Sequence, residues 1–589
     1  MAQVTRRDFM KAGASATAAA AALGSAATVA LADGAPAGTQ GAGFMANVPV
    51  WLGEAPKIDE ADIAREESCE ILVLGSGNAG VPCALRAAEL GADVLVVEPM
   101  TYEEYDNYAC DMSSYNSQTF LDAGAPEYDL TEVYNEYMRK SISKALPSLI
   151  KKWVSRSGEA IDFVVSHVPQ DVKDEFMHLC NCPNGPKGFS GESCGSHNFI
   201  GMIQWRQVNP NANMWPKVIV NLIDAIEAAG GRHIWGASGV VLEQNEAGDV
   251  TGCICQDLDG AYFRVKASKG VVLACGDYGG NPDMLLDLTD EIRNLKWSIG
   301  GDRTTSDGIF GMGRDGSGIK MGMWAGGTME PGPRAPMSSG FSSRPSFPFG
   351  GCWPVFGPDG KRFYNEAITK FGNQGVYNHM PDGSLCATVV DSTWREGLEY
   401  QDYGHSSMDL SNAYYIGVIE DEMAAYKTGP EGFPVHNFMV YGEATTNVIA
   451  ADTLEELGGY LGYEGEALQG FLDEIAHYNE MCHNGHDDDW GYDPQLMFPI
   501  ETPPFFGMAN TVAHERVSAG LVQLAGLNTD WTGTQQVVRG DKTPIKGLYA
   551  TGNCCGNRYG IQYHTPTSGN SCGMAITLGY CLGEELANA

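Results

Sequence analysis

A glycine-rich turn between two apolar runs constrains the fold of this chain more than any other feature. Residues 70–98 read EILVLGSGNAGVPCALRAAELGADVLVVE. The apolar runs predict a buried strand at Ile71–Leu74 and a second strand at Ala92–Val97. Val81–Leu90 is rich in alanine and leucine, which predicts a helix, and Pro82 is tolerated in its first turn. Strand, turn, helix and strand in this order form a βαβ unit.

The turn itself carries the chemistry of dinucleotide binding. Gly75, Gly77 and Gly80 have the spacing Gly-x-Gly-x-x-Gly, which lets the backbone approach a pyrophosphate at the N-terminus of the helix. Glu98 ends the second strand, where a carboxylate can bind both hydroxyls of an adenosine ribose. The residues predicted to contact the cofactor in this unit are Gly75, Ser76, Gly77, Asn78, Ala79, Gly80 and Glu98.

Two later apolar runs indicate FAD rather than NAD. Lys269–Leu285 reads KGVVLACGDYGGNPDML, and Ile545–Gly556 reads IKGLYATGNCCG. Each is a buried strand that breaks into a glycine turn. A nicotinamide domain would not return to its sheet so late in the chain, whereas two-domain flavoproteins do. We therefore expect non-covalently bound FAD.

Together these motifs resemble the flavoprotein family of soluble fumarate and urocanate reductases and 3-ketosteroid dehydrogenases. The resemblance implies an α/β fold in which a Rossmann-like FAD-binding domain is interrupted by an α+β capping domain. Substrate would lie between the cap and the isoalloxazine ring. The matching segments are the fingerprint at 70–98, VVLACGDYGGNPDM, RDGSGIKMGMWAGG, GKRFYNEA, YNEMCHNGHDDDWG, PIETPPFFG and GLYATGN, in this order.

The same matches divide the chain into segments. The predicted segments are a signal peptide at 1–32, a polar leader at 33–68, the first part of the FAD-binding domain at 69–330, the capping domain at 331–503, and the second part of the FAD-binding domain at 504–589. Within the cap, Thr453 and Glu456 predict a capping box at the start of a helix. The acidic, histidine-rich HNGHDDDWGYD segment matches a family loop, so we expect a structural role for it and no metal site.

The N-terminus predicts export in the folded state. Thr5–Lys11 reads TRRDFMK, an alanine-rich apolar run follows, and Ala30–Ala32 provides a small-residue cleavage site. This order is typical of a twin-arginine signal, and an ordinary secretory signal is the alternative. A cofactor made in the cytoplasm has to be bound before export, which suits the twin-arginine route. We expect the protein in the periplasm, or on the outer face of the cytoplasmic membrane or at the cell surface.

The charge of the chain narrows the range of partners. The formal net charge is −37, which argues against nucleic acid and anionic lipid and suits a basic protein. No stretch after the signal is apolar enough to predict a membrane helix. The sequence has no C-x-x-C-H, so the chain would not attach its own c-type haem. We expect a separate electron donor, a c-type cytochrome.

The sixteen cysteines do not form a recognisable disulfide framework. Cys83 and Cys275 fall in predicted core elements, where cysteine behaves as a small apolar residue. Cys180, Cys182 and Cys194 could ligate an iron–sulfur cluster or form a disulfide. Their spacing meets no standard ligand pattern, so we expect no metal or cluster.

The resemblance implies the chemistry and several site residues. Members of the family move a hydride between flavin N5 and the carbon β to an electron-withdrawing group, and a cap residue moves the proton. Lys370 occupies the position where fumarate reductases carry a proton-donating arginine. A lysine desolvated under a cap can donate a proton near neutrality. Tyr364 and Tyr377 are alternatives, and Glu366 of the same motif is a further candidate.

Other matched positions concern the substrate. Arg516 stands where the reductases have a substrate-binding histidine, and Pro566 where they have a carboxylate-clamping arginine. Tyr563 and Gly569 resemble the pair that steroid dehydrogenases place on the substrate carbonyl. Arg558 could contact an anion or neutralise the flavin region. The remaining predicted cofactor contacts, with Ser113 and Ser114 expected around the pyrophosphate, are Ser113, Ser114, Val240, Cys275, Gly276, Gly552, Asn553, Gly569, Asn570, Ser571 and Met574.

These observations predict an exported FAD-dependent reductase that saturates an activated C=C bond of an enone or acrylate, as in anaerobic respiration. A doubly charged dicarboxylate is disfavoured because Pro566 replaces the clamping arginine. The alternative is a 3-ketosteroid dehydrogenase that runs the same chemistry in reverse. A flavin-binding protein without catalysis would bind FAD but turn over no acceptor.

Overall fold

The structure is a computed structural model. It describes residues 49–107, 111–180, 190–191, 196–197, 201–208, 212–289, 314–337, 340–341, 345–351, 353–366, 374–377, 379–398, 400, 413–437, 444–512, 517–518, 522–567 and 569–589. The chain divides into two compact units, Met1–Glu54 and Ala55–Ala589. The described part of the first unit is a turn in which the Leu52 amide donates to the Pro49 carbonyl at 3.0 Å.

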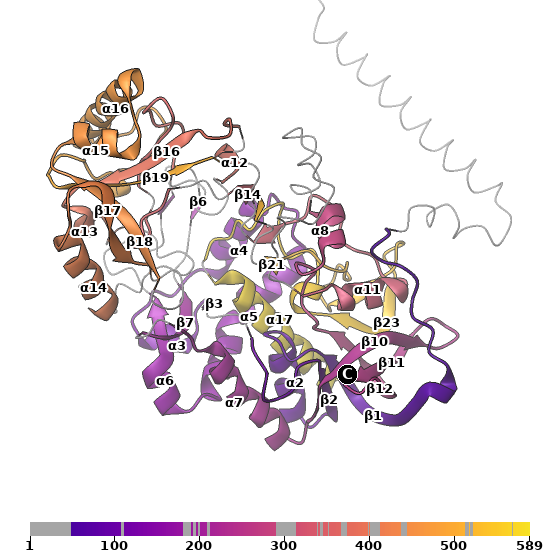
Figure 1. The fold of residues 1–589 in the computed structure, drawn as a ribbon. Coiled ribbons are helices and arrows are strands. Elements are labelled where there is room, and N and C mark those ends of the chain that lie inside the picture. The colour runs from indigo at the N-terminus through magenta and orange to yellow at the C-terminus, as the bar shows by residue number, and fades with distance from the viewer. Residues whose placement is uncertain are drawn as a thin grey trace, which may run out of the picture. The chain divides into compact units, whose positions relative to one another are not determined.

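An eight-stranded sheet forms the centre of the larger unit (Figure 1). Six of its strands have the order β10-β11-β12-β1-β2-β9. The strand β23 pairs with the second half of β12, and β22 pairs with β23. The strands β12, β1, β2 and β9 are parallel to one another, and so is β23 to β12. The bounds are β1 Ile63–Leu74, β2 Val94–Glu98, β9 Arg232–Trp235, β10 Ala237–Gln244, β11 Val250–Asp257, β12 Tyr262–Leu273, β22 Gln536–Val538 and β23 Pro544–Ala550. Both central strands are apolar where helices cover them, as parallel sheets require.

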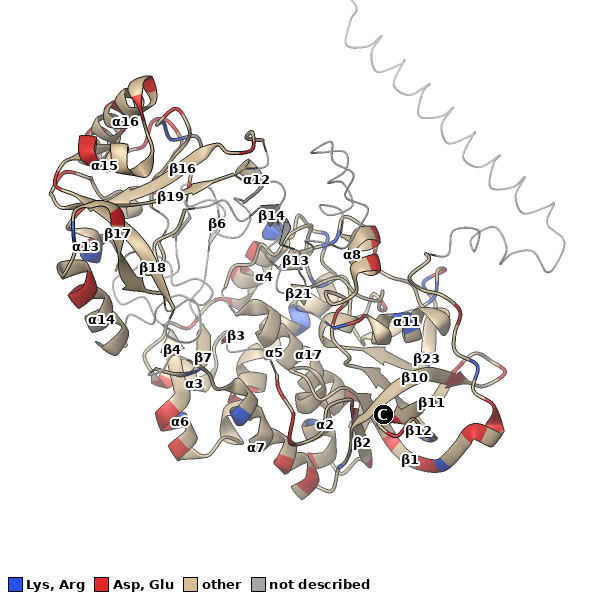
Figure 2. Cartoon of the chain, viewed as in Figure 1, with Lys and Arg blue, Asp and Glu red and all other residues tan. Residues whose placement is uncertain are grey.

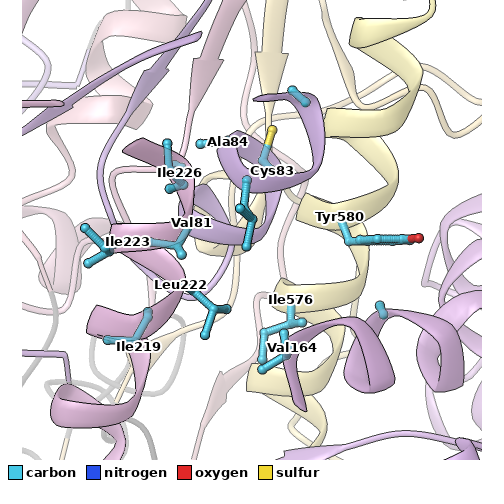
Figure 3. Packing of buried hydrophobic residues seen from close by; sticks show 14 of the residues in the cluster. Val81, Cys83, Ala84, Val164, Ile219, Leu222, Ile223, Ile226, Ile576 and Tyr580 are labelled. Atoms are coloured by element: carbon cyan, nitrogen blue, oxygen red, sulfur yellow. The ribbon is translucent and has the colours of Figure 1, made fainter. Parts of the chain in front are cut away.

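Four helices build the core beside this sheet. They are α2 Gly80–Glu89, α5 Pro147–Ser166, α7 Trp215–Ala228 and α17 Asn570–Ala587. Figure 3 shows Val81 of α2, Ile223 of α7 and Ile576 of α17 in one buried cluster. On α17, a Cβ at Gly579 would lie 2.1 Å from the Ala79 carbonyl oxygen. Only glycine therefore allows α17 to cross so close to α2.

A smaller antiparallel sheet holds the segment after the fingerprint. It has the order β3-β7-β4, with β8 paired to β7, and its strands are β3 Asp111–Ser113, β4 Met177–Cys180, β7 Met202–Gln207 and β8 Ala212–Asn213. The Ser113 amide donates to the Gly569 carbonyl at 3.0 Å, and the Ser114 amide to the Gly201 carbonyl at 2.9 Å. The first bond joins β3 to the N-terminus of α17, and the second joins the end of β3 to the residue before β7.

The cap is built on a separate five-stranded antiparallel sheet. Its order is β15-β16-β19-β18-β17, with β15 Val355–Phe356, β16 Leu385–Val390, β17 Gly429–His436, β18 Thr445–Ala451 and β19 Phe505–Thr511. The helices α15 Leu454–Leu461 and α16 Gly465–Asn484 contribute to one apolar core, and α13 Trp394–Leu398 and α14 Ala413–Ala424 to another.

The remaining elements are short. They are η2 Glu60–Asp62, α3 Gln118–Asp122, α4 Leu130–Lys140, α6 Gln170–Phe176, β5 Ser190–Gly191, β6 Ser196–His197, α8 Pro282–Leu288, α11 Ser317–Trp324, β13 Pro336–Met337, β14 Gly340–Phe341, α12 Gln374–Tyr377, η4 Pro494–Leu496, β20 Val517–Ser518, β21 Val522–Gln523 and η5 Gly552–Cys554. Figure 2 shows acidic residues on the helices α6, α14 and α15. Within the described ranges, no helix has the length and apolar character to span a bilayer.

The predicted fold class is confirmed: an α/β FAD-binding region of Rossmann type is interrupted by an α+β cap. Two boundaries differ from the sequence-based ones. The first strand begins at Ile63 within the expected leader, because its charged half pairs with β12. The cap sheet continues to Thr511, past the predicted end at 503, because β19 pairs with β16 and β18. The predicted helix N-cap at Thr453 is present, because the Glu456 amide donates to the Thr453 hydroxyl at 3.2 Å.

Candidate FAD and substrate site

The three fingerprint glycines serve different purposes. Gly75 has a φ of +106°, and a Cβ there would lie 2.6 Å from the Ala274 carbonyl oxygen. A Cβ at Gly80 would lie 1.9 Å from the Gly75 carbonyl oxygen, so this glycine is required by helix–strand packing. At Gly77 a Cβ would meet no heavy atom of the protein within 4 Å. Space beside the Gly77 backbone fits the pyrophosphate of FAD at the start of α2.

Buried polar atoms without partners mark the same site. The hydroxyls of Ser76, Ser113 and Ser114 and both side-chain polar atoms of Asn570 are buried and lack hydrogen-bond partners among the described residues. All four residues were predicted cofactor contacts. Because such orphaned groups carry a desolvation cost, a polar ligand in this site would relieve it. The residues present therefore fit FAD.

Glu98 lies at the carboxyl end of β2 with only 5% of its surface exposed. Its carboxylate accepts hydrogen bonds from the Ser76 amide at 2.8 Å and the Met100 amide at 3.2 Å. These neutral donors leave lone pairs on the carboxylate for ribose hydroxyls. The geometry supports the predicted ribose contact.

The side chain of the predicted cofactor contact Asn78 is bound to other parts of the protein. Its side-chain oxygen accepts from the Trp215 indole at 2.6 Å and from the Asn107 amide group at 3.1 Å. Its side-chain nitrogen lies 3.8 Å from the Cys572 sulfur. Asn78 therefore fastens the turn to α7 and α17, and only its backbone remains to face a cofactor. Ala79 directly precedes α2, and no side chain caps that helix.

The late strands bring further predicted contacts to the ends of the sheet. Val240 lies at a register shift between β10 and β11, where the backbone leaves the regular ladder. Cys275 follows β12 and directs its thiol at the Leu74 carbonyl at 3.3 Å. Gly276 has a positive φ of +83°, and its carbonyl accepts from the Cys554 thiol at 3.1 Å. A hydrogen bond with Cys554 and burial raise the pKa of the Cys275 thiol well above its usual range.

After β23, Gly552 adopts a φ of +58°. The next residue, Asn553, is hydrogen-bonded to Arg558. The Arg558 guanidinium donates to the Asn553 side-chain oxygen at 2.6 Å and to the Cys555 carbonyl at 2.8 Å. It lies 5.0 Å from the Tyr559 ring and is fully buried. Arg558 thus adds a buried positive charge beside the predicted flavin contacts. Met574 is buried in α17.

A buried ion-pair network fixes the GKRFYNEA motif of the cap. Arg362 donates to Glu366 at 2.9 Å and to Asp487 at 3.0 Å, and all three side chains have 0% exposure. Glu366 also accepts from the Val355 amide at 2.8 Å. With its oxygens committed in this way, Glu366 holds the motif in place. Its predicted role as a catalytic group is not supported.

The HNGHDDDWG loop supplies the other half of this network, as its predicted structural role requires. Asp487 accepts from the backbone amides of Asp489 and Trp490 in addition to Arg362. Burial would raise the pKa of Asp487, but Arg362 and the backbone amides of Trp490 and Tyr492 outweigh it and hold that pKa below its usual range. No group of metal-ligating side chains occurs within the residues that the structure describes.

Tyr364 and Tyr377, the alternative proton donors, lie together in the cap. Their hydroxyl oxygens are 3.1 Å apart, and both side chains are buried. The predicted donor Lys370 and the predicted substrate contact Arg516 lie outside the described residues. So do Cys182 and Cys194, and the side chain of Cys180 is not described either.

The Tyr563 hydroxyl accepts a hydrogen bond from the Ser571 amide at 2.9 Å. This contact brings it to the N-terminus of α17, beside the predicted cofactor contacts Gly569 and Asn570. Its ring packs edge-on against Tyr559 with centroids 5.5 Å apart. The structure therefore groups the predicted substrate residue Tyr563 with the predicted cofactor contacts at the N-terminus of α17. Sequence reasoning missed its neighbour His564, whose partner is on α4.

Comparisons with known proteins agree with this geometry. A family model described as FAD binding domain matches residues 70–572. The chain is 24% identical to the vinyl phenol reductase of Lactiplantibacillus plantarum, covering 89% of this chain and 97% of that one. It is 23% identical to the 3-oxosteroid 1-dehydrogenase of Mycobacterium tuberculosis, covering 88% and 98%. It is 22% identical to the fumarate reductase (cytochrome) of Shewanella frigidimarina, covering 91% and 78%.

A solved structure supports the fold. The 3-ketosteroid-Δ4-(5α)-dehydrogenase of Rhodococcus jostii aligns with a TM-score of 0.61 at 20% identity, over 91% of this chain and 99% of that one. The matched family model spans the fingerprint, the cap and the start of α17. The chain therefore belongs to the FAD-binding-domain family and is an FAD-dependent oxidoreductase of the kind that acts on C=C bonds.

Proposed function

We propose that this protein is an exported reductase that saturates the activated C=C bond of an enone or acrylate. The observation that carries the proposal is the grouping of Tyr563 with the N-terminus of α17. Pro566 lies between Tyr563 and that helix, where the resemblance would place a carboxylate-clamping arginine. A single oxygen-bearing activating group suits this site better than a small dicarboxylate. The similarity to a vinyl phenol reductase also favours reduction of an aromatic substrate.

The cofactor is held by residues already described. Gly77 and the start of α2, with Ser113 and Ser114, would hold the pyrophosphate, Glu98 the ribose, and Asn570 the flavin end. When bound, FAD supplies hydride chemistry at its N5 atom. The contribution of the chain is to orient the double bond, polarise its activating group and deliver a proton to the α carbon.

Two candidates can deliver the proton. We propose Lys370, on family position, with the Tyr364–Tyr377 pair as the alternative. The pair has a specific observation in its favour, because two buried hydroxyls within hydrogen-bond distance can pass a proton between them. Lys370→Met and Tyr377→Phe distinguish the two.

Loss of a positioned acid lowers turnover by about 10²–10⁴-fold. Lys370→Met is expected to lose this much while keeping FAD and its reduction by viologen. Lys370→Arg should recover part of the rate if charge matters more than shape. Turnover of Lys370→Met within a few-fold of the parent, together with an inactive Tyr377→Phe, would assign the proton to the tyrosine.

The direct test of the function is a screen with reduced methyl viologen as electron donor. Unsaturated acids, enones and steroids are offered as acceptors, and oxidation of the viologen is followed by absorbance. We expect turnover with an enone or an acrylate and little with fumarate. Fumarate as the best acceptor would overturn the substrate class. FAD-loaded protein that oxidises viologen with none of them would overturn the reductase proposal.

The second candidate function is desaturation of a 3-ketosteroid. The similarity to a 3-oxosteroid 1-dehydrogenase along almost its full length favours it. The test uses saturated ketosteroids with an artificial electron acceptor. Desaturation faster than the reverse reduction would make this the physiological direction.

We also propose that export follows the twin-arginine route and that electrons come from a basic c-type cytochrome. The net charge of −37 would steer such a partner, and steering weakens with salt. The similarity to a fumarate reductase (cytochrome) supports a cytochrome as donor. Rapid turnover with NADH alone would contradict a separate donor. Export that persists after Arg6 and Arg7 are both replaced by lysine would contradict the route.

A further inference from the structure

The segment that leads to Tyr563 is fastened to the C-terminal end of α4. The Tyr137 hydroxyl donates to the Arg558 carbonyl at 2.8 Å, and the Lys144 ammonium to the Gly560 carbonyl at 3.3 Å. In the turn that follows α4, the Leu146 amide donates to the Asn557 carbonyl at 2.7 Å. These contacts run along the chain toward the N-terminus of α17. They give the segment a defined conformation before it reaches the candidate substrate site.

The last contact in this series joins two titratable side chains. The Lys140 ammonium lies 3.3 Å from His564 Nε2, and its side chain is only 4% exposed. A Glu136 carboxylate oxygen lies 3.7 Å from the ammonium. Because an ammonium has donors and no acceptor, Nε2 must be the unprotonated nitrogen. The hydrogen of the neutral imidazole is therefore on Nδ1.

The environment keeps the ring neutral. Burial and the adjacent Lys140 lower the pKa of His564 to about 4. Near neutral pH the side chain thus presents one N–H donor in a single tautomer. Among the described residues, Nδ1 has no hydrogen-bond partner. His564, the residue after Tyr563, therefore carries a fixed N–H donor that no described residue of the protein uses.

We propose that Lys140 and His564 form a donor pair that polarises the activating oxygen of the substrate. His564 Nδ1–H donates to the carbonyl of an enone or the carboxyl of an acrylate, and Lys140 is the positioning residue that fixes the tautomer. Negative charge grows on that oxygen as hydride reaches the β carbon, so the hydrogen bond strengthens in the transition state. The proton stays on nitrogen. This inference rests on the proposed reductase function.

The pair also contributes to substrate selection. Lys140 is a local positive charge in a chain of net charge −37, and a neutral imidazole between it and the ligand accommodates both neutral and singly anionic oxygens. A substrate whose double bond lacks an attached oxygen group gains nothing from this donor. The pair therefore favours enones and acrylates over simple vinyl arenes.

The activity test uses benzylideneacetone and cinnamate as acceptors with reduced methyl viologen. His564→Phe removes the donor and is expected to lower kcat/KM by about 10²–10³-fold, mainly through kcat. His564→Asn retains an N–H donor in the position of Nδ1, so its kcat/KM should be at least ten-fold higher than that of His564→Phe. His477→Asn, at an exposed histidine on α16, is the matched control and should leave the rate unchanged. His564→Phe within three-fold of the parent would overturn the proposal.

A second measurement is independent of turnover and separates this proposal from the proposed function. Histidine labelled with ¹⁵N reports the tautomer of each ring, and His564→Asn identifies the His564 signals. We expect the Nδ1–H form at pH 7, mixed tautomers in Lys140→Met, and recovery in Lys140→Arg. An Nε2–H form, or no change in Lys140→Met, would overturn the pair. If the tautomer is as expected but neither acceptor is turned over, the substrate class of the proposed function has failed.

Discussion

Two buried carboxylates in this protein have opposite surroundings. Glu98 in the FAD-binding region accepts from two backbone amides and has no ion-pair partner within the described part of the chain. Glu366 in the cap is paired with Arg362, which also holds Asp487. A carboxylate that meets only neutral donors keeps capacity for a ligand, whereas one bound to a guanidinium is committed to the protein. The first arrangement is the one expected of a ligand contact, and the second holds two parts of the cap together.

The largest effect is expected from variants that abolish FAD binding. Gly77→Val fills the open space beside the phosphate turn, and Glu98→Arg removes the ribose acceptor and buries an unpaired cation. Both variants are expected to purify with little FAD, measured as the ratio of flavin to protein absorbance. Gly459→Ala, at another glycine with open space around it, should keep full FAD content. Normal FAD in both test variants would contradict the assignment of this site.

A smaller effect, on the free energy of unfolding, is expected when the buried ion pairs of the cap are removed. Arg362→Met leaves Glu366 and Asp487 buried without a cation, which costs about 3–5 kcal/mol of unfolding free energy. Urea unfolding monitored by tryptophan fluorescence measures this loss. Arg395→Met removes an ion pair whose side chains are 30% and 47% exposed, so it should cost below about 1 kcal/mol. Equal losses in the two variants would show that burial does not set the strength of these pairs.

The third prediction concerns the buried histidine His233 and the pH dependence of stability. His233 on β9 has a side chain with 0% exposure, and neither ring nitrogen has a hydrogen-bond partner among the described residues. Burial lowers the pKa of His233 to about 4, against about 6.5 for an exposed histidine.

Between these pH values the unfolded chain binds the proton and the folded chain does not, so stability falls as the pH is lowered from 6.5 to 4. His233→Leu should flatten this slope and gain about 2–3 kcal/mol relative to the parent at pH 4. Urea unfolding at a series of pH values measures it. His477→Asn should leave the slope unchanged, and an unchanged slope in His233→Leu would show that this ring is hydrated or paired.

The smallest effect concerns a local feature of the cap. The Thr453 hydroxyl accepts from the Glu456 amide at the start of α15 and donates to the Glu456 carboxylate at 3.0 Å. Thr453→Ala is expected to cost about 1 kcal/mol, seen as a small decrease in Tm, whereas Thr453→Ser should cost less. A decrease as large as that of Arg362→Met would mean that α15 depends on its cap far more than helices usually do.

Features encoded by neighbouring residues were predictable from the sequence. The strand, turn and helix of the fingerprint, the buried runs at β12 and β23 and the cap at Thr453 each follow from a short pattern. The start of β1 was missed because its exposed half is charged and reads as a linker. Ion pairs such as Arg264 with Glu66, at 2.7 Å, support that half of the strand on its partner β12.

Contacts between distant residues were not predictable. Arg362 and Asp487 lie 125 residues apart, and Lys140 and His564 lie 424 residues apart. No local pattern distinguishes these side chains from exposed charges, because their burial is decided by the packing of separate elements. The pairing of Glu366 with Arg362 was not foreseen for the same reason. Site residues set by backbone geometry are therefore easier to predict than those set by side-chain partners.

The late return of the chain to its first sheet has a consequence for biosynthesis. The strand β23 pairs with β12, and the predicted cofactor contacts Gly569 and Asn570 lie at the start of α17. A ribosome that adds about 5–20 residues per second exposes the fingerprint long before these elements exist. FAD captured early would therefore contact only part of its site. Stable loading of the cofactor has to wait until nearly the whole chain has been synthesised, so it is a post-translational event.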